Sequence, residues 1–205
     1  MIKLFSNSHW QKPFLIWLIL ILPAVAIECL EMLVGVDVRY VRSAILQGEW
    51  WRLLSAHLDH LGWAHLALNS AFLALLLALF KPLQSLAKTL LLWLLICLVI
   101  SFSMLLFSPQ LQWYVGLSGS LYGLLVFGLV RDESYATGLR FISSLIVVAK
   151  VVFEQIEGAS TQVSQIISGP VAEESHLYGL MAGGLMVLIS LAAKYLYELK
   201  NDQAA

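Results

Sequence analysis

The sequence contains few charged residues. Only 12% of its 205 residues are Asp, Glu, Lys or Arg, whereas soluble domains carry about 25%. Hydrophobic residues make up 60% of the chain, and the mean hydropathy is +0.84. The formal net charge is -1, which gives no basic surface for nucleic acid. The composition excludes an ordinary soluble domain and indicates a protein that crosses the lipid bilayer several times.

Cysteine is scarce as well. Cys29 and Cys97 both lie in apolar stretches, where an isolated cysteine usually acts as a small packing residue. We therefore expect no disulfide framework. The zinc motif H-E-x-x-H is missing, and no carboxylate or thiolate spacing supports a metal site. We expect neither a metal nor another cofactor, although a metal site is the competing interpretation for four histidines, His57, His60, His65 and His176.

Six apolar stretches are candidate membrane spans, at 14–33, 61–80, 90–107, 118–130, 141–153 and 176–197. A spanning helix needs about 20 largely apolar residues. The fourth and fifth stretches are shorter, so each either extends into its flanks or begins inside the membrane against protein or a wet cavity. The first stretch exceeds the apolar region of about 7–15 residues in a signal peptide and lacks an A-x-A site, so we expect a retained span.

No repeat, low-complexity tract or domain boundary interrupts the chain. We predict an all-α polytopic membrane protein with six transmembrane helices in one domain over residues 1–205. The long outer first loop, 34–60, carries Trp50-Trp51-Arg52. It is expected to lie at the membrane interface, because Trp favours the headgroup level and Arg can extend toward it. Residues 198–205 are expected to form a short cytoplasmic tail.

Lysine and arginine predict the orientation, because they are more frequent in cytoplasmic segments. With both termini in the cytoplasm, the inner side holds Lys3, Lys12, Lys81, Lys88, Arg131, Arg140, Lys194 and Lys200. The outer side holds Arg39, Arg42, Arg52 and Lys150, together with the acidic residues Glu154, Glu157, Glu173 and Glu174. The second, fourth and sixth helices then run inward, which places His65, Ser118 and His176 at similar depth near the outer face.

The fourth span opens on Gly116-Leu117-Ser118-Gly119. A serine alone is usually a benign helix residue bonded to the backbone of the previous turn, but Gly116 and Gly119 permit a sharp turn and close approach. His176 opens the sixth span. An ionisable residue inside a membrane is a functional candidate, although a histidine can also be satisfied at the interface.

Glycines four residues apart give two of the helices close-packing faces: Gly119 with Gly123, and Gly179 with Gly183. If the faces meet, Ser118 and His176 approach within hydrogen-bond distance, and the imidazole can take the serine proton. Outside the first predicted span, which contains Glu28 and Glu31, no carboxylate lies within the predicted spans to orient His176. Glu173 and Glu174 are expected in a loop. A dyad is therefore favoured over a triad.

Three further polar side chains each lie four residues from another polar candidate on the same helix face. Tyr122 follows Ser118 by four residues and either packs on His176 or fills the core. His65 and Asn69 project together from the second helix, where they and the Ser118 backbone N–H are suitable donors to an oxyanion. His60 is expected at the outer end of the same helix, ordering the first loop by hydrogen bonds.

In order and spacing, these motifs resemble the rhomboid intramembrane serine proteases over nearly all six spans. The matching residues are Trp51-Arg52, the H-x4-H-x3-N pattern of His60, His65 and Asn69, Gly116-Leu117-Ser118-Gly119 with Tyr122, and His176 with Gly179 and Gly183. The resemblance implies Ser118 as nucleophile and His176 as general base. It implies His65, Asn69 and the Ser118 amide as oxyanion stabilisers, and a water-filled cavity open to the outer side.

A narrower resemblance, to the bacterial rhombosortases, rests on Glu49-Trp50-Trp51-Arg52, Lys150 with Phe153-Glu154-Gln155 and Gly158, and His176-Leu177-Tyr178-Gly179. It implies the bacterial inner membrane and single-span membrane substrates with C-terminal Gly-Gly sorting tails. The expected activity is hydrolysis near the outer end of a substrate span, or transpeptidation if an amine replaces water. The alternatives are an inactive rhomboid-like scaffold that binds membrane clients, and a transporter, which the lack of an inverted repeat disfavours.

Overall fold

The computed structural model describes residues 8–202, which are mostly helical. The long helices are α1 (Ser8–Val34), α4 (Trp63–Leu79), α5 (Leu86–Phe107), α6 (Ser118–Arg131), α7 (Thr137–Glu157) and α9 (Glu173–Asp202). The short elements are β1 (Tyr40–Val41), α2 (Arg42–Leu46), α3 (Arg52–Ser55), the 3-10 helix η1 (Lys81–Gln84), β2 (Trp113–Tyr114) and α8 (Thr161–Ile166).

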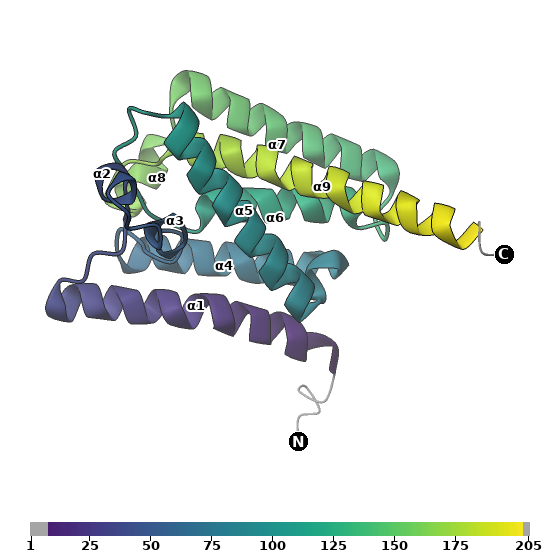
Figure 1. Ribbon diagram of the computed structural model, residues 1–205, viewed down its shortest axis with the longest axis horizontal. Helices are drawn as coiled ribbons and strands as arrows, with labels where there is room; N and C mark the ends of the chain where they lie inside the picture. The colour runs from purple at the N-terminus through teal and green to yellow at the C-terminus, as the bar shows by residue number, and fades with distance from the viewer. Residues whose placement is uncertain (1–7, 203–205) are drawn as a thin grey trace.

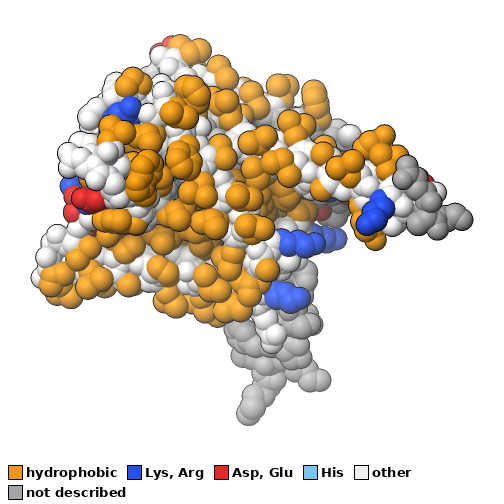
Figure 2. All heavy atoms as spheres, in the orientation of Figure 1, with side chains coloured by type: hydrophobic (Ala, Val, Ile, Leu, Met, Phe, Trp, Pro, Cys, Tyr) orange, Lys and Arg blue, Asp and Glu red, His pale blue; other side chains and the backbone are white. Residues whose placement is uncertain are grey.

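Consecutive long helices alternate in direction, so that α1 begins and α9 ends at the same end of the bundle (Figure 1). The short helices α2, α3 and α8 gather at the opposite end. Figure 2 shows apolar side chains over most of the face between the two ends, with Lys, Arg, Asp and Glu toward the ends. Because an extended apolar surface is costly in water, this arrangement suits a bundle surrounded by lipid.

Within residues 8–202, three helices are long and apolar enough to cross a membrane: Trp10–Val34 of α1, α5 and α9. The helices α4 and α6 are apolar but shorter. The helix α7 is long but carries Arg140, Lys150 and Glu154. The prediction of a mostly helical protein is confirmed, and three of the described helices are candidate membrane spans. The number of six spans stays a prediction.

The helices α7 and α9 extend beyond the predicted stretches in ways that bear on the site and on the predicted tail. The fifth stretch, 141–153, is part of α7, which continues to Glu157 and ends at Gly158 with a φ of +82°. The helix α9 continues through Asp202, so residues 198–202 of the predicted cytoplasmic tail are helical; residues 194–202 contain neither Gly nor Pro, the residues that most disfavour a helix. Lys3 and residues 203–205, which also entered the predicted topology, lie outside the described residues.

The first loop is tied to the segment that leads into α6. The strand β1 pairs antiparallel with β2, with Tyr40 opposite Tyr114. The Gly116 N–H donates to the Ala56 carbonyl over 2.9 Å, so the chain after α3 touches the turn just before α6. These backbone bonds hold the start of α6 against the first loop.

Arg52 fixes the first loop internally. Its guanidinium lies 2.6 Å from Glu49 Oε2, donates to the Arg39 carbonyl over 2.8 Å, and stacks 4.4 Å from the Trp51 ring centre. The Trp50 and Trp51 side chains are exposed. Exposed Trp beside a partly buried Arg is the pattern expected of a loop at the membrane interface.

The helices α6 and α9 meet through glycines. A Cβ on Gly179 would collide with the Gly119 carbonyl, and one on Gly183 with the Gly123 carbonyl. A Cβ on Gly119 would lie only 2.7 Å from the Ser175 carbonyl, next to His176. Because no side chain separates the two backbones here, the beginning of α6 and the beginning of α9 are forced together.

Replacing Gly179 by Ala should destabilise the bundle, because the new methyl group would push α9 away from α6. Such overpacking typically costs about 1–3 kcal/mol. Gly184→Ala is the matched control on the same helix, since a Cβ there meets nothing within 4 Å. Thermal unfolding in detergent should show a lower melting temperature for Gly179→Ala only. Equal melting temperatures for the two variants would contradict this packing.

Candidate active site

A cavity of 610 Å³ opens beside the start of α6. Its walls come from α4, α6, α7, α8 and α9, represented by His65, Ser118, Lys150, Val163 and His176. Ser118 is half-buried and is the first residue of α6. The first N–H groups of a helix have no acceptor within the helix, so the Ser118 amide is available to a group bound in the cavity.

The turn before Ser118 depends on Gly116, which has a φ of +117°. This left-handed backbone conformation is unfavourable for residues with a side chain. The Tyr114 hydroxyl donates to the Gly116 carbonyl, and the Ser120 hydroxyl donates to the Leu117 carbonyl over 2.7 Å. These bonds hold the chain as it enters α6 and so fix the direction of the Ser118 side chain.

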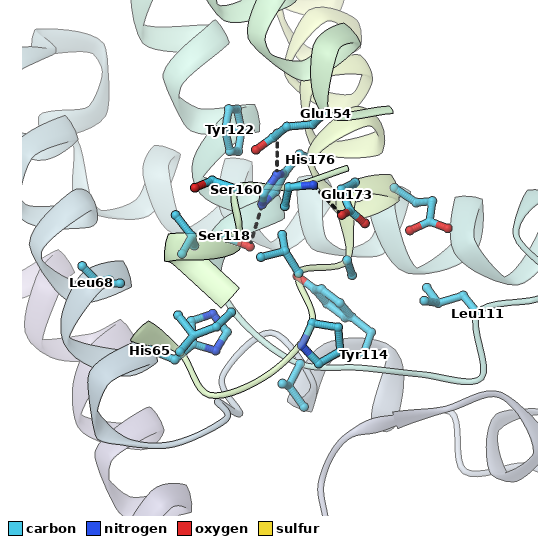
Figure 3. A pocket seen from close by; sticks show the side chains of 18 of the residues that line it. His65, Leu68, Leu111, Tyr114, Ser118, Tyr122, Glu154, Ser160, Glu173 and His176 are labelled. Carbon is cyan, nitrogen blue, oxygen red and sulfur yellow. Dashed lines mark hydrogen bonds and ion pairs between the residues drawn. The ribbon is translucent and has the colours of Figure 1, made fainter. Parts of the chain in front are cut away.

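Ser118 and His176 are hydrogen-bonded. Ser118 Oγ lies 3.1 Å from His176 Nε2 (Figure 3). His176 is buried on the first turns of α9. The pair is brought together by the close approach of Gly119 to Ser175, since each of these residues adjoins a member of the pair.

A carboxylate lies on the other side of the imidazole. Glu154 Oε2 is 3.0 Å from His176 Nδ1 (Figure 3). Glu154 Oε1 is 2.5 Å from Lys150 Nζ. The expectation that no carboxylate reaches His176 is therefore wrong. The predicted fifth span ends at residue 153, which assigns Glu154 to the outer segment. The spacing of Lys150 and Glu154 as i and i+4 is the sequence signal that the helix continues.

The hydrogen bonds determine which imidazole nitrogen carries the proton. A carboxylate can only accept, so His176 Nδ1–H donates to Glu154. In neutral His176 the Nε2 atom is then an acceptor, and the Ser118 hydroxyl donates to it. This is the arrangement that a base needs to take the serine proton.

Tyr122 packs against the imidazole. The ring centres of Tyr122 and His176 are 4.5 Å apart with an interplanar angle of 35°. The Lys150 ammonium donates to the Tyr122 hydroxyl and also contacts Glu154. Two neighbouring helices, α6 and α7, therefore restrict the movement of the His176 ring.

His65 and Asn69 face the turn before Ser118 from α4. A Cβ on Gly116 would lie 3.0 Å from His65 Nε2 and 3.7 Å from Asn69 Nδ2. The Leu61 N–H donates to His65 Nδ1 over 3.3 Å, so in neutral His65 the proton is on Nε2. Asn69 Nδ2 is buried without a hydrogen-bond partner among residues 8–202. Two N–H donors thus lie near the turn that leads to Ser118.

His57 and His60 belong to the first loop. His60 Nδ1 bonds to the Leu58 carbonyl, and its ring lies edge-on to His65 at 4.9 Å. Burial, followed by the nearby His65, lowers the pKa of His60 to about 3. His57 Nε2 is 2.9 Å from Ser101 Oγ, and burial lowers its pKa to about 4. Both rings are therefore neutral at pH 7, and His57 lies outside the cavity wall formed by the described residues.

Two further glutamates line the cavity from a helix rather than from a loop. Glu173 and Glu174 form the first turn of α9, so their predicted loop placement is wrong. Glu173 Oε1 accepts from the Ala159 N–H over 2.8 Å, and Glu174 lies 3.3 Å from Gln110. Acidic residues stabilise a helix N-terminus through the helix dipole, which explains why α9 begins before His176.

The Rhomboid domain family model matches residues 47–193. This range covers most of the chain, including α6, α7 and the part of α9 that holds the candidate site. The chain belongs to the rhomboid family, whose members are generally intramembrane serine proteases. A search of curated proteins found no match.

The buried Asp59 beside His60 should make stability depend on pH. Its Oδ1 accepts the His60 N–H over 2.8 Å. Burial, with a smaller contribution from Glu31, raises the pKa of Asp59 from 3.8 to about 7. Between these values the folded state keeps a proton that the unfolded state has lost, so stability falls as pH rises.

The variant Asp59→Asn cannot ionise and keeps the acceptor oxygen. Its stability relative to the wild type should rise from pH 4 to pH 8 by on the order of 4 kcal/mol and then level off. Thermal unfolding of both proteins across this range measures the difference. A difference that does not change with pH would contradict the raised pKa.

Proposed function

We propose that the protein is an intramembrane serine endopeptidase in which Ser118 is the nucleophile and His176 the general base. The observation that carries this proposal is the 3.1 Å contact between Ser118 Oγ and His176 Nε2, with the His176 proton held on Nδ1. Ser118 Oγ attacks the substrate carbonyl carbon while Nε2 takes the hydroxyl proton. His176 returns that proton to the amine as the peptide C–N bond breaks.

The tetrahedral intermediate carries a negative oxygen that must be stabilised. The candidate donors are the Ser118 amide, His65 Nε2–H and Asn69 Nδ2–H. The proximity of both side chains to Gly116, and the unpartnered amide of Asn69, support this role. Water in the cavity then hydrolyses the acyl-enzyme through the same groups, whereas an amine acceptor would produce a transpeptidation.

The proposed membrane placement has six spans in one domain over residues 1–205. The alternating direction of the long helices supports it, since it puts the start of α1 and the end of α9 at one end (Figure 1). The excess of Lys and Arg in the inner segments supports cytoplasmic termini. The resemblance to the rhombosortases supports the inner membrane of a bacterial cell. Ser118 and His176 then lie toward the periplasmic side of the inner membrane.

The proposed substrates are single-span membrane proteins with C-terminal Gly-Gly sorting tails. A helix must unwind before cleavage, because its carbonyl groups are occupied by hydrogen bonds. Each glycine weakens a helix by about 1 kcal/mol relative to alanine. The cavity of 610 Å³ beside Ser118 provides space for a short unwound segment.

Purified protein should cleave a substrate with a Gly-Gly tail, and Ser118→Ala or His176→Ala should each lower the rate by about 10³-fold or more, because each removes a member of the proton-transfer pair. A fluorophosphonate probe should label the wild type at Ser118. Cleavage that survives either substitution would exclude the proposed pair. A folded wild type that binds client spans but is neither active nor labelled would favour the inactive scaffold.

Replacing Asn69 by Ala should remove one oxyanion donor while leaving the Ser118–His176 contact in place. The loss of such a donor typically costs about 2.7–4 kcal/mol of transition-state stabilisation, or about 10²–10³-fold in kcat. Cleavage kinetics should show a fall in kcat with a smaller change in KM. An unchanged kcat would exclude Asn69 from the oxyanion site.

A further inference from the structure

We propose that Glu154 is a positioning residue for His176, so that the site operates as a Ser-His-Glu triad held in place by Lys150. This inference rests on the proposed function and deepens it. The juxtaposition that carries it is a single carboxylate with both oxygens engaged: Oε2 at 3.0 Å from His176 Nδ1 and Oε1 at 2.5 Å from Lys150 Nζ.

The burial of the pair makes this contact consequential. The side chains of His176 and Glu154 are only 8% and 11% exposed. Electrostatic interactions are stronger at such sites than in water, because the local dielectric constant is lower. When Ser118 gives up its proton, a positive imidazolium forms beside an ionised Glu154, which stabilises the charge as it develops.

Glu154 also determines the tautomer of His176. If Nδ1–H donates to the carboxylate, Nε2 is free to accept the Ser118 proton. Without the carboxylate, neutral His176 can carry its proton on Nε2 instead, and that form cannot act as a base toward Ser118. The carboxylate therefore affects the fraction of molecules in which His176 has the productive tautomer, as well as the energy of the transition state.

Lys150 completes the arrangement from one turn earlier on α7. It pairs with Glu154 and also donates to the Tyr122 hydroxyl, while the Tyr122 ring packs on His176. A buried carboxylate is costly unless it is paired. Lys150 therefore favours the ionised form of Glu154. It also connects Glu154, which bonds to His176, with Tyr122, which packs on the His176 ring.

The simpler alternative is that Glu154 only anchors α7 to α9. In that case its removal would lower stability and affect activity only through misfolding. The two roles differ in three measurable ways: the partition between kcat and KM, the melting temperature, and recovery by a shorter carboxylate.

The test compares Glu154→Gln with Glu157→Gln, a matched change at an exposed glutamate three residues further on α7. Glu154→Gln should lower kcat and the rate of fluorophosphonate labelling by about 10²-fold or more, with little change in KM. Glu157→Gln should behave as the wild type. Glu154→Asp, which keeps the charge, should recover part of the lost rate.

A double variant separates the positioning role from damage to the ion pair. Glu154→Gln leaves the half-exposed Lys150 ammonium without its carboxylate partner, whereas Lys150→Met together with Glu154→Gln removes both charges of the ion pair. The melting temperature of the double variant should return toward the wild-type value, but its cleavage rate should remain as low as that of Glu154→Gln. Recovery of the wild-type rate in the double variant would overturn the proposal.

The outcomes also distinguish this inference from the proposed function. If the probe labels the wild type at Ser118 and does not label His176→Ala, the proposed function stands. If Glu154→Gln then labels and cleaves as fast as Glu157→Gln, only the positioning role of Glu154 fails. If the folded wild type neither labels nor cleaves, the protease itself fails.

Discussion

The direct contact between the backbones of α6 and α9 is the constraint on which the site depends. Gly179 and Gly183 bring α9 against the carbonyls of α6, and Gly119 admits the Ser175 carbonyl. Ser118 and His176 adjoin these contact points, so their 3.1 Å separation follows from helix packing rather than from a flexible loop. A methyl group added at this interface would push Ser118 and His176 apart, although it changes neither of these side chains.

A second constraint is that buried polar groups in an apolar bundle need partners. At His176 the partners are Ser118 and Glu154, and at His65 the Leu61 N–H occupies one ring nitrogen. Each bond fixes a proton position as well as a ring orientation. The same requirement that stabilises the fold thus gives His176 a free acceptor toward Ser118 and gives His65 a free donor toward Gly116.

The sequence predicted much of this site because several of its residues repeat at helical spacing. Ser118 with Tyr122, His65 with Asn69, and the glycine pairs each share a helix face, and periodicity reveals such sets. Glu154 was missed because hydropathy ends the fifth span where polar residues begin. The structure instead continues α7 to Glu157, since hydrogen bonds to Lys150 and His176 compensate the burial of the Glu154 carboxylate.

The sequence by itself determined a helical membrane protein of the rhomboid family, and it singled out Ser118 and His176 among many apolar residues. Composition is sufficient for the membrane class, and the order and spacing of the motifs carry the resemblance to the rhomboid family. Both can be read along the chain without knowing how the helices pack. The tertiary structure decided which groups meet: Glu154 reaches His176 from α7, and β1 with Ala56 holds the turn at Gly116. These contacts join segments far apart in the chain, and only the packing of whole helices sets their distances.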